Sequence, residues 1–325
     1  MKKILYTVCS ANHLAHCKTM VHSFMEHHEG YEIVIGLVDR IDDRFTEEEF
    51  LPCRLVEIEK MDIPDFQDLL FRYTVIELNC AMKVFVAEYI FQQYHPDILL
   101  YLDSDMWVKG SLQELEAQLA EHPILLTPHF TIPLPDNTAK PLERDLLRSG
   151  IYNAGFMAYR RSDTVTRFLQ WWREHMRGEC YYNFAEGMGV DQIWLNLVPL
   201  LFEETGIVRH PGANVAYWNL HERSLSEQEG KVMVNGTHPL LFLHISGYRF
   251  DEPEKISRHQ DRFLMSDQPV LRQMLDAYRA LVIGNGYQKF SPMPCLYAKP
   301  VKKSTGLMRT VNQLLKPLGV KLSNS

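Results

Sequence analysis

Residues 98–105 read ILLYLDSD, an apolar run that ends in two carboxylates. A short apolar run of this kind is typical of a strand buried in a sheet. Because side chains alternate along an extended chain, Asp103 and Asp105 would lie on one face and could approach one hard divalent cation. Carboxylate oxygens favour Mg²⁺ or Mn²⁺ over zinc. Such a cation suits a diphosphate group, whose developing negative charge it can neutralise.

Working outward from this stretch, further apolar runs predict more strands. They are residues 4–8, 33–38, 124–127, 156–159 and 240–245. Apolar residues at helical spacing predict helices over residues 14–25 and 77–94, the second ending before His95 and Pro96. Strands that alternate with helices of this length indicate an α/β fold with a parallel-rich sheet and helices on both faces. In such sheets, ligands bind beyond the carboxyl ends of the strands.

The composition is that of an ordinary globular protein. Of the 325 residues, 46% are hydrophobic and 23% are charged, which excludes collagen, coiled-coil and wholly disordered chains. The six cysteines form no C-x-x-C pair and are too sparse for a disulfide framework, which indicates a reducing compartment. No apolar run approaches the roughly 18 residues of a membrane span, and the N-terminal run is too short for a secretory signal. We therefore expect a cytoplasmic protein.

The charge is distributed unevenly along the chain. The formal net charge is −7, yet no acidic residue follows Asp276, whereas eight lysines and arginines do. Apolar residues in this last segment recur at helical spacing, which a tail that binds only phosphate, as in nucleic acid, would not need. We expect a body of residues 1–290 and a basic amphipathic tail of residues 291–325. The tail would either lie on the inner face of the cytoplasmic membrane or pack on the body, and no nucleic-acid partner is expected.

Five motifs follow one another in an order that resembles the GT-A nucleotide-sugar glycosyltransferases. They are residues 7–14 (TVCSANHL), 101–105 (YLDSD, preceded by 77–83), 152–156 (YNAGF), 189–196 (GVDQIWLN) and 243–247 (LHISG). The likeness covers residues 4 to about 248 and is greatest to glycosyltransferase family 8, which includes bacterial lipooligosaccharide galactosyltransferases and glycogenin. It implies a Rossmann-like, mixed and mostly parallel sheet. It also implies a nucleotide diphosphate sugar as donor substrate, together with Mn²⁺ or Mg²⁺.

The same resemblance implies a site. The metal ligands would be Asp103, Asp105 and His244. The residues that would bind the nucleotide sugar are Thr7, Ser10, Asn12, Lys83, Asp103, Ser104, Asn153, Gly155 and Gly247. Among these, Lys83 would offset the diphosphate charge, and Gly155 would let the backbone approach the sugar. Asp191 and Gln192 would face the reacting sugar carbon as the catalytic candidates, although Asp191 also suits a helix N-cap.

Other residues carry expectations of their own. No acidic residue precedes Asn12 in the first loop, which leaves the base of the nucleotide open, and residues 248–250 (YRF) replace the Lys-Pro-Trp that often follows the His-x-x-Gly segment. Beyond the Asp-Gln segment, side chains suited to a sugar or anionic acceptor are Tyr217, Trp218, His221 and Arg223. Histidines with no evident carboxylate partner, expected on helix surfaces, are His13, His16, His27 and His28.

Taken together, these features predict a metal-dependent, retaining glycosyltransferase. It would move a hexose from a nucleotide diphosphate sugar, with UDP as the first choice, to a saccharide acceptor. The basic tail suggests an acceptor carried on lipid, such as a surface glycan. Two alternatives stay open: a metal-dependent phosphohydrolase, because those enzymes also place Asp-x-Asp after an apolar strand, and a catalytically silent protein that binds a nucleotide sugar. The oligomeric state is not predicted.

Overall fold

The structure is a computed structural model and describes residues 1–299, so the expected tail helix falls outside the described residues. The longer strands are β1 (Lys3–Cys9), β2 (Tyr31–Leu37), β3 (Arg54–Glu57), β4 (Ile98–Leu102), β6 (Ile124–Pro128) and β7 (Tyr152–Arg160). The shorter strands are β5 (Met106–Val108), β8 (Tyr182–Asn183), β9 (Met188–Gly189), β10 (Thr205–Ile207), β11 (Leu225–Gln228), β12 (Lys231–Val234), β13 (His238–Pro239) and β14 (Phe242–His244). The α-helices are α1 (Leu14–Met25), α2 (Phe66–Arg72), α3 (Val75–Gln93), α4 (Gln113–Gln118), α5 (Glu143–Ser149), α6 (Asp163–Gly178), α7 (Val198–Leu201), α8 (Pro269–Gly284) and α9 (Tyr287–Phe290).

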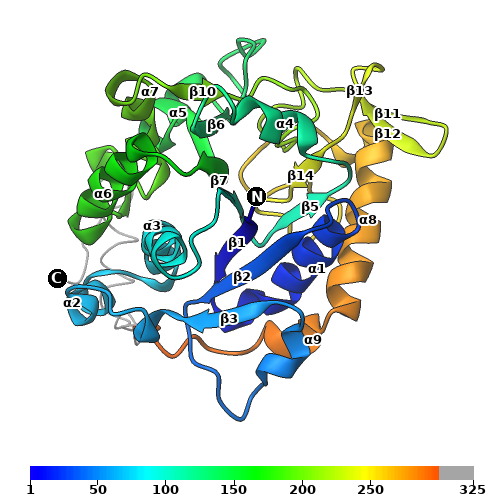
Figure 1. Cartoon of the computed structure of the whole chain (residues 1–325). Coiled ribbons are helices and arrows are strands. Elements are labelled where there is room, and N and C mark those ends of the chain that lie inside the picture. Colours follow the sequence, from blue (N-terminus) through cyan, green and yellow to red (C-terminus); the bar gives the residue numbers. More distant parts are fainter. Residues whose placement is uncertain (300–325) are drawn as a thin grey trace, which may run out of the picture.

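Seven strands form the central sheet, in the order β10-β6-β7-β4-β1-β2-β3 (Figure 1). Every neighbouring pair is parallel except those of β7, which runs antiparallel to both β4 and β6. The prediction of a mixed, mostly parallel sheet is therefore confirmed. Each predicted apolar run is a strand, but the last one, β14, lies outside this sheet and pairs with β5.

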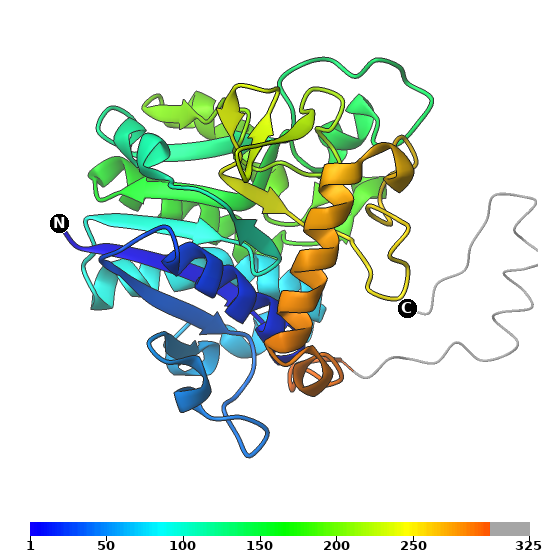
Figure 2. The same ribbon diagram turned by 90° about the vertical axis from the view of Figure 1, so that its right-hand side faces the viewer.

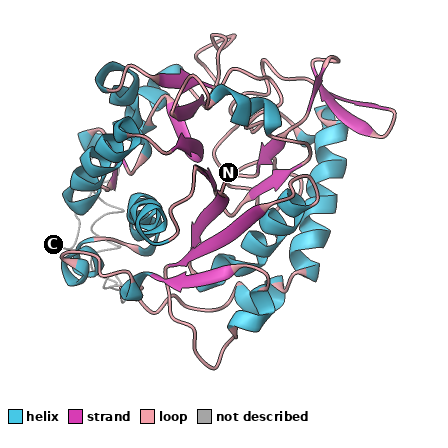
Figure 3. Cartoon of the chain, viewed as in Figure 1, coloured by secondary structure: helices cyan, strands magenta, loops and turns pink. Residues whose placement is uncertain are grey.

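Helices cover both faces of the sheet, as the alternation of strands and helices predicted. On one face α1 and α8 pack together, and on the other α3 packs against α6. Figures 1 and 2 show α8 standing beside α1, and Figure 3 shows the strands passing between the two groups of helices. Each group encloses its own apolar core, so the sheet is buried on both sides.

Helix α3 shows how local sequence sets the position of the site. Thr74 and Glu77 form a capping box, in which the Thr74 N–H donates to a carboxylate oxygen of Glu77 at 2.8 Å. The helix ends at Tyr94, because His95 has φ of 52° and precedes Pro96. With both ends fixed and its length packed on β1 and α6, α3 holds its first turns at the carboxyl edge of the sheet.

A smaller sheet and a loop region complete the body. Strands β11, β12 and β13 form an antiparallel sheet. The segment that follows α9 packs back on the body, where the Cys295 thiol contacts the carbonyl oxygen of Val38 at 3.2 Å.

Among the helices of residues 1–299, none is both long and apolar enough to cross a bilayer.

Candidate functional site

A cleft opens where β1 and β4 end. Its volume is about 1310 Å³ when its solvent-filled mouth is included. The loop after β1, the first turns of α3, the turn after β4 and the loop after β14 all line it. Of the residues predicted to bind the nucleotide sugar, those that line the cleft are Ser10, Asn12, Lys83, Asp103, Ser104 and Gly247. The cleft therefore lies at the carboxyl edge of the sheet, where the sequence predicted that a ligand would bind.

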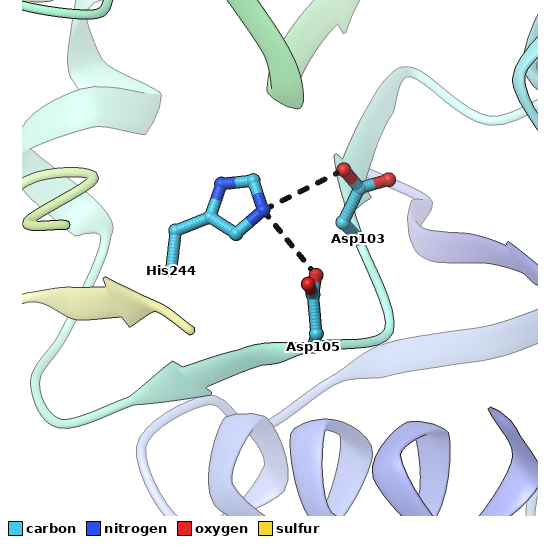
Figure 4. A group of neighbouring side chains, drawn as sticks. All are labelled: Asp103, Asp105 and His244. Atoms are coloured by element: carbon cyan, nitrogen blue, oxygen red, sulfur yellow. Dashed lines mark ion pairs between the residues drawn. The ribbon is translucent and has the colours of Figure 1, made fainter. Parts of the chain in front are cut away.

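Three of the predicted side chains converge on one another, and two of them, Asp103 and Asp105, line this cleft (Figure 4). A carboxylate oxygen from Asp103, one from Asp105 and a ring nitrogen of His244 all lie within 4.8 Å of one another. The Nε2 atom of His244 is 3.3 Å from Asp105 Oδ1 and 3.9 Å from Asp103 Oδ2. The two aspartates flank the turn between β4 and β5, and His244 reaches them because β14 pairs with β5, placing it opposite Met106.

The hydrogen bonds of His244 determine which ring nitrogen carries hydrogen. The Asn153 Oδ1 atom accepts from the Gly155 N–H at 3.1 Å and from Asn214 Nδ2 at 3.2 Å, so the amide orientation of Asn153 is defined. Because His244 Nδ1 lies 3.1 Å from this oxygen, Nδ1 must be the donor. In the neutral ring, Nε2 then carries a lone pair and faces the two carboxylates.

This donor set fits a hard divalent cation. Two carboxylate oxygens and an imidazole lone pair point at one another, an arrangement that repels itself unless a proton or a cation lies between them. Burial alone would raise the pKa of Asp105, but a second proton on the facing His244 ring, with smaller effects of charge on His13 and His16, lowers it well below its usual range, and a cation in the place of that proton would act in the same direction. The carboxylate is therefore ionised near neutral pH, the form in which it binds metal.

Lys83 meets these carboxylates from the opposite side. Its ammonium lies 3.1 Å from Asp103 Oδ1 and 2.9 Å from Asp191 Oδ2, and it donates to the Ala154 carbonyl oxygen at 3.1 Å. Burial would lower the pKa of Lys83, but the two carboxylates raise it, so the side chain is charged. The expectation was that Lys83 offsets diphosphate charge, yet in the structure its charge is already shared between two aspartates.

The catalytic candidates begin the 3₁₀ helix Gln192–Leu197. Asp191 occupies the N-cap position, but its side chain makes no capping hydrogen bond and pairs with Lys83 instead. Burial raises the pKa of Asp191, and Lys83 opposes that rise. The backbone is held by Trp172, whose Nε1 donates to the Asp191 carbonyl oxygen at 3.2 Å, while Gln192 Oε1 lies 3.5 Å from the Ala154 N–H nitrogen.

The remaining predicted residues, Thr7, Asn153 and Gly155, do not line the open cleft. Thr7 is fully buried in β1, and its hydroxyl has no hydrogen-bond partner among the described residues. Asn153 bonds to His244, as described above. At Gly155, a Cβ atom would lie 2.5 Å from His244 Cε1 and 2.7 Å from Met106 Cε, so the imidazole itself requires a glycine here.

Several expectations about other polar residues are wrong. Arg223 is not available to an acceptor, because it is buried, pairs with Glu222 at 3.3 Å and donates to the Ala213 carbonyl oxygen. Trp218 is buried too, with its ring edge against His244 at a centroid distance of 5.0 Å. Both were expected from residue type alone, which does not distinguish an exposed arginine or tryptophan from a buried one.

The histidines differ most from expectation. His28 is buried, and its Nε2 atom accepts the Leu112 N–H at 2.8 Å. His13 and His16 line the cleft beside Asp105, and burial lowers the pKa of His16 to about 4, so it is neutral there. His13 and His27 are both exposed as expected, although His13 faces the cleft. The sequence did hold a signal that His13 and His16 lie together: they are three residues apart after the first loop, and residues i and i+3 share a helix face.

Comparison with known proteins gives distant relatives. No protein-family model matches the chain. The uncharacterized protein YfnF of Bacillus subtilis (strain 168) is 28% identical over 149 residues, which are 46% of this chain and 49% of YfnF, so the match spans about half of that relative. The uncharacterized protein YfnD of the same organism is 21% identical over 246 residues, which are 74% of this chain and 76% of YfnD.

Solved structures show where the fold belongs. The galactosyltransferase LgtC, in complex with donor and acceptor sugar analogues, superposes with a TM-score of 0.50 at 15% identity and covers 90% of this chain and 97% of that one. The apo form of the glycosyltransferase GlyE of Streptococcus pneumoniae TIGR4 has a TM-score of 0.50 at 15% identity, covering 91% of this chain and 65% of that one. The resemblance found in the motifs is therefore confirmed for the fold: the chain has the GT-A fold of these glycosyltransferases.

Proposed function

We propose that the chain is a metal-dependent glycosyltransferase that moves a hexose from a nucleotide diphosphate sugar to a saccharide acceptor. The observation that carries this proposal is the convergence of Asp103, Asp105 and His244 beside an open cleft that both aspartates line. The GT-A fold supports it, since one solved protein of this fold, LgtC, is a galactosyltransferase bound to donor and acceptor analogues. UDP is the proposed nucleotide.

The chemistry of the donor set explains why a diphosphate would bind. Asp103, Asp105 and His244 would hold Mn²⁺ or Mg²⁺, which supplies Lewis-acid stabilisation of the leaving diphosphate. Other residues of the chain would orient the metal ligands and bind the nucleoside. Asn153 fixes the tautomer of His244, and Lys83 holds Asp103 in place through its ion pair. Ser10 and Asn12 lie at the end of β1 in the same cleft, where they could contact the nucleoside.

The reaction is proposed to retain the anomeric configuration. Asp191 and Gln192 are the candidates that would face the reacting carbon. Retention by a covalent route needs a carboxylate nucleophile and an acid/base group about 5 Å away. Asp191 is a buried carboxylate paired with Lys83, and Gln192 presents an amide beside the Asn153-Ala154 backbone, so the two offer different routes. A front-face route with amide stabilisation remains an equal candidate within this proposal.

The acceptor is proposed to be a saccharide carried on lipid. Its basis is the basic segment after Asp276, which anionic lipids would attract at the cytoplasmic face of a membrane. The first part of the expected tail, residues 291–299, makes several contacts with the body: Arg44 Nη1 donates to the Pro294 carbonyl oxygen at 2.9 Å, and Lys299 Nζ donates to that of Arg72 at 2.8 Å. We propose residues 300–325 as the membrane-binding part.

A nucleotide-sugar screen tests the proposed function. UDP-, GDP- and ADP-hexoses are incubated with the full chain, with and without Mn²⁺, and thermal shift, free nucleotide and inorganic phosphate are measured. We expect Mn²⁺-dependent stabilisation by one donor and release of its nucleoside diphosphate when a saccharide acceptor is added. Release of inorganic phosphate without acceptor would identify a phosphohydrolase, and binding without turnover on any acceptor would identify a silent binding protein. Either result refutes the transferase.

A further inference from the structure

Lys83 and one divalent cation would balance only the carboxylates around the metal-binding group. They would leave no positive charge for a bound diphosphate. The carboxylates of Asp103, Asp105 and Asp191 are balanced by Lys83 and one divalent cation. A diphosphate that bridges a nucleoside and a sugar adds two negative charges, so further cations should line the cleft.

Two arginines line the cleft, and they differ in their partners. Arg249 is engaged by its own segment: its Nη2 donates to Asp251 Oδ2 at 2.5 Å, and its Nε lies 3.6 Å from Glu252 Oε2. Arg258 has no carboxylate partner within residues 1–299, and its Nε donates to a ring nitrogen of His259 at 3.1 Å. Of these two guanidinium groups, Arg258 is the one whose charge is not compensated by an acid.

The backbone around Arg258 is tied to the segment that carries the metal-binding histidine. The Arg258 N–H donates to the Gly247 carbonyl oxygen at 3.0 Å. Gly247 has φ of +72°, and a Cβ atom there would lie 2.6 Å from Ser257 Oγ and 2.4 Å from His259 Cδ2. The turn that contains Arg258 therefore packs directly on Gly247, three residues after His244. In Figure 2 this segment is the yellow loop between β14 and α8.

We propose that Arg258 binds the diphosphate of the nucleotide sugar. This inference rests on the proposed function and adds a residue to the donor site that the sequence analysis did not assign. The guanidinium group presents several N–H donors in a planar fork that matches phosphate oxygens. The backbone of Arg258 is held by the hydrogen bond to Gly247, and its side chain lines the same cleft as Asp103 and Asp105.

The test compares nucleotide binding in Arg258→Ala and Arg258→Lys with that in Arg249→Ala. UDP, GDP and ADP are titrated calorimetrically into the wild-type full chain with Mn²⁺, and the tightest ligand is carried to the variants beside its nucleoside. We expect Arg258→Ala to weaken diphosphate binding about ten- to a hundredfold and to leave nucleoside binding unchanged. Arg258→Lys should fall between, and Arg249→Ala should lose less, because its charge is already paired.

The outcomes separate the inference from the function on which it rests. If the wild-type chain binds none of the three diphosphates, the proposed function is refuted, and this inference with it. If the wild type binds but Arg258→Ala binds within twofold of it, only the role of Arg258 is refuted. Equal losses in Arg258→Ala and Arg249→Ala, or an equal loss for the nucleoside, would refute it too. Melting temperatures of all variants verify folding, which the exposure of Arg258 should preserve.

Discussion

Asp191 and Asp105 lie on opposite sides of Asp103 and meet very different partners. The Asp191 side chain is 3% exposed and pairs with Lys83, itself 7% exposed, so the two charges are enclosed together. The Asp105 side chain is 29% exposed and faces His244, whose hydrogen is held on the far ring nitrogen by Asn153. The carboxylate of Asp191 is thus neutralised by Lys83. The carboxylate of Asp105 instead faces the lone pair of the His244 ring.

This difference separates a structural charge pair from a binding site. A buried carboxylate and a buried lysine neutralise each other and need no ligand. Removing either partner leaves the other charge buried and uncompensated. The aspartate-histidine group is incomplete without a cation and opens to the cleft. We expect substitution of Lys83 to act mainly on stability, and substitutions on the His244 side to act mainly on metal binding and turnover.

The largest effect is expected from Asp105→Asn. The amide keeps the shape but removes a carboxylate from the cation, so transfer should fall at least about a thousandfold. Mn²⁺ affinity, measured by electron paramagnetic resonance titration, should fall with it, while the melting temperature should change little. Asp68→Asn, at an exposed position on α2, is the matched control. Full metal-stimulated turnover by the Asp105 variant contradicts the assignment.

Lys83→Met tests the closed side of the comparison. Methionine fills similar space but leaves Asp191 buried beside a second carboxylate, which should cost about 3–5 kcal/mol of unfolding free energy. Urea denaturation near neutral pH measures the loss, and lowering the pH should recover part of it as Asp191 takes up a proton. The exposed Lys109, changed to Met, should be nearly neutral. A stable Lys83→Met chain would show that the pair is not a structural lock.

Asn214→Gly tests the tautomer on the open side. Asn214 has φ of +56°, which glycine adopts without strain, and its amide bonds to Asn153 Oδ1 and lies beside His244 Nδ1. Loss of this support should weaken Mn²⁺ binding about ten- to a hundredfold. The control is Asn235→Gly, an exposed asparagine with φ of +54°. Equal Mn²⁺ affinity in both variants would mean that Asn153 alone orients the ring.

The smallest effect concerns His129, which lies behind Asn153. Burial lowers the pKa of His129 to about 4, and its Nδ1 lies 3.2 Å from the Ile151 carbonyl oxygen. Since the unfolded chain binds this proton near pH 6.5, the contribution of His129 is fully present above that pH and is lost as the pH falls towards 4. As the pH falls from 6.5 to 5, this group should lower the free energy of unfolding by about 2 kcal/mol.

Urea unfolding of the wild type and of His129→Gln at several pH values measures that contribution. The variant should show a weaker dependence on pH between 5 and 6.5, and His122→Gln, outside this network, should follow the wild type. Parallel curves for His129→Gln and the wild type would contradict the low pKa.

Much of the fold was predictable because it depends on local pattern. Apolar runs marked the strands, Pro96 marked the end of α3, and the two aspartates after Ile98–Leu102 lie where they were expected, whereas the Thr74 cap that begins α3 was not predicted. His244 was predictable only through its motif, since its approach to the aspartates depends on the pairing of β14 with β5. Nothing in the periodicity of either strand specifies that pairing.

The rest of the site depends on tertiary packing that the pattern does not carry. Whether a polar side chain is buried decided the outcome for Arg223 and Trp218, and burial is a property of the assembled core. Asn214 was not predicted as a site residue, because its role appears only beside Asn153 and His244. Arg258 likewise acquires meaning from its hydrogen bond to Gly247.

The lack of space for a side chain at Gly155 has a practical consequence for redesign. The three atoms that a new methyl group would strike there are His244 Cε1, Asn153 Oδ1 and Met106 Cε, all within 2.7 Å. An attempt to reshape sugar preference through this position would therefore displace the imidazole first. A side chain at position 155 would change the metal-binding group as well as the proposed sugar pocket, so library designs that vary that pocket should leave position 155 as glycine.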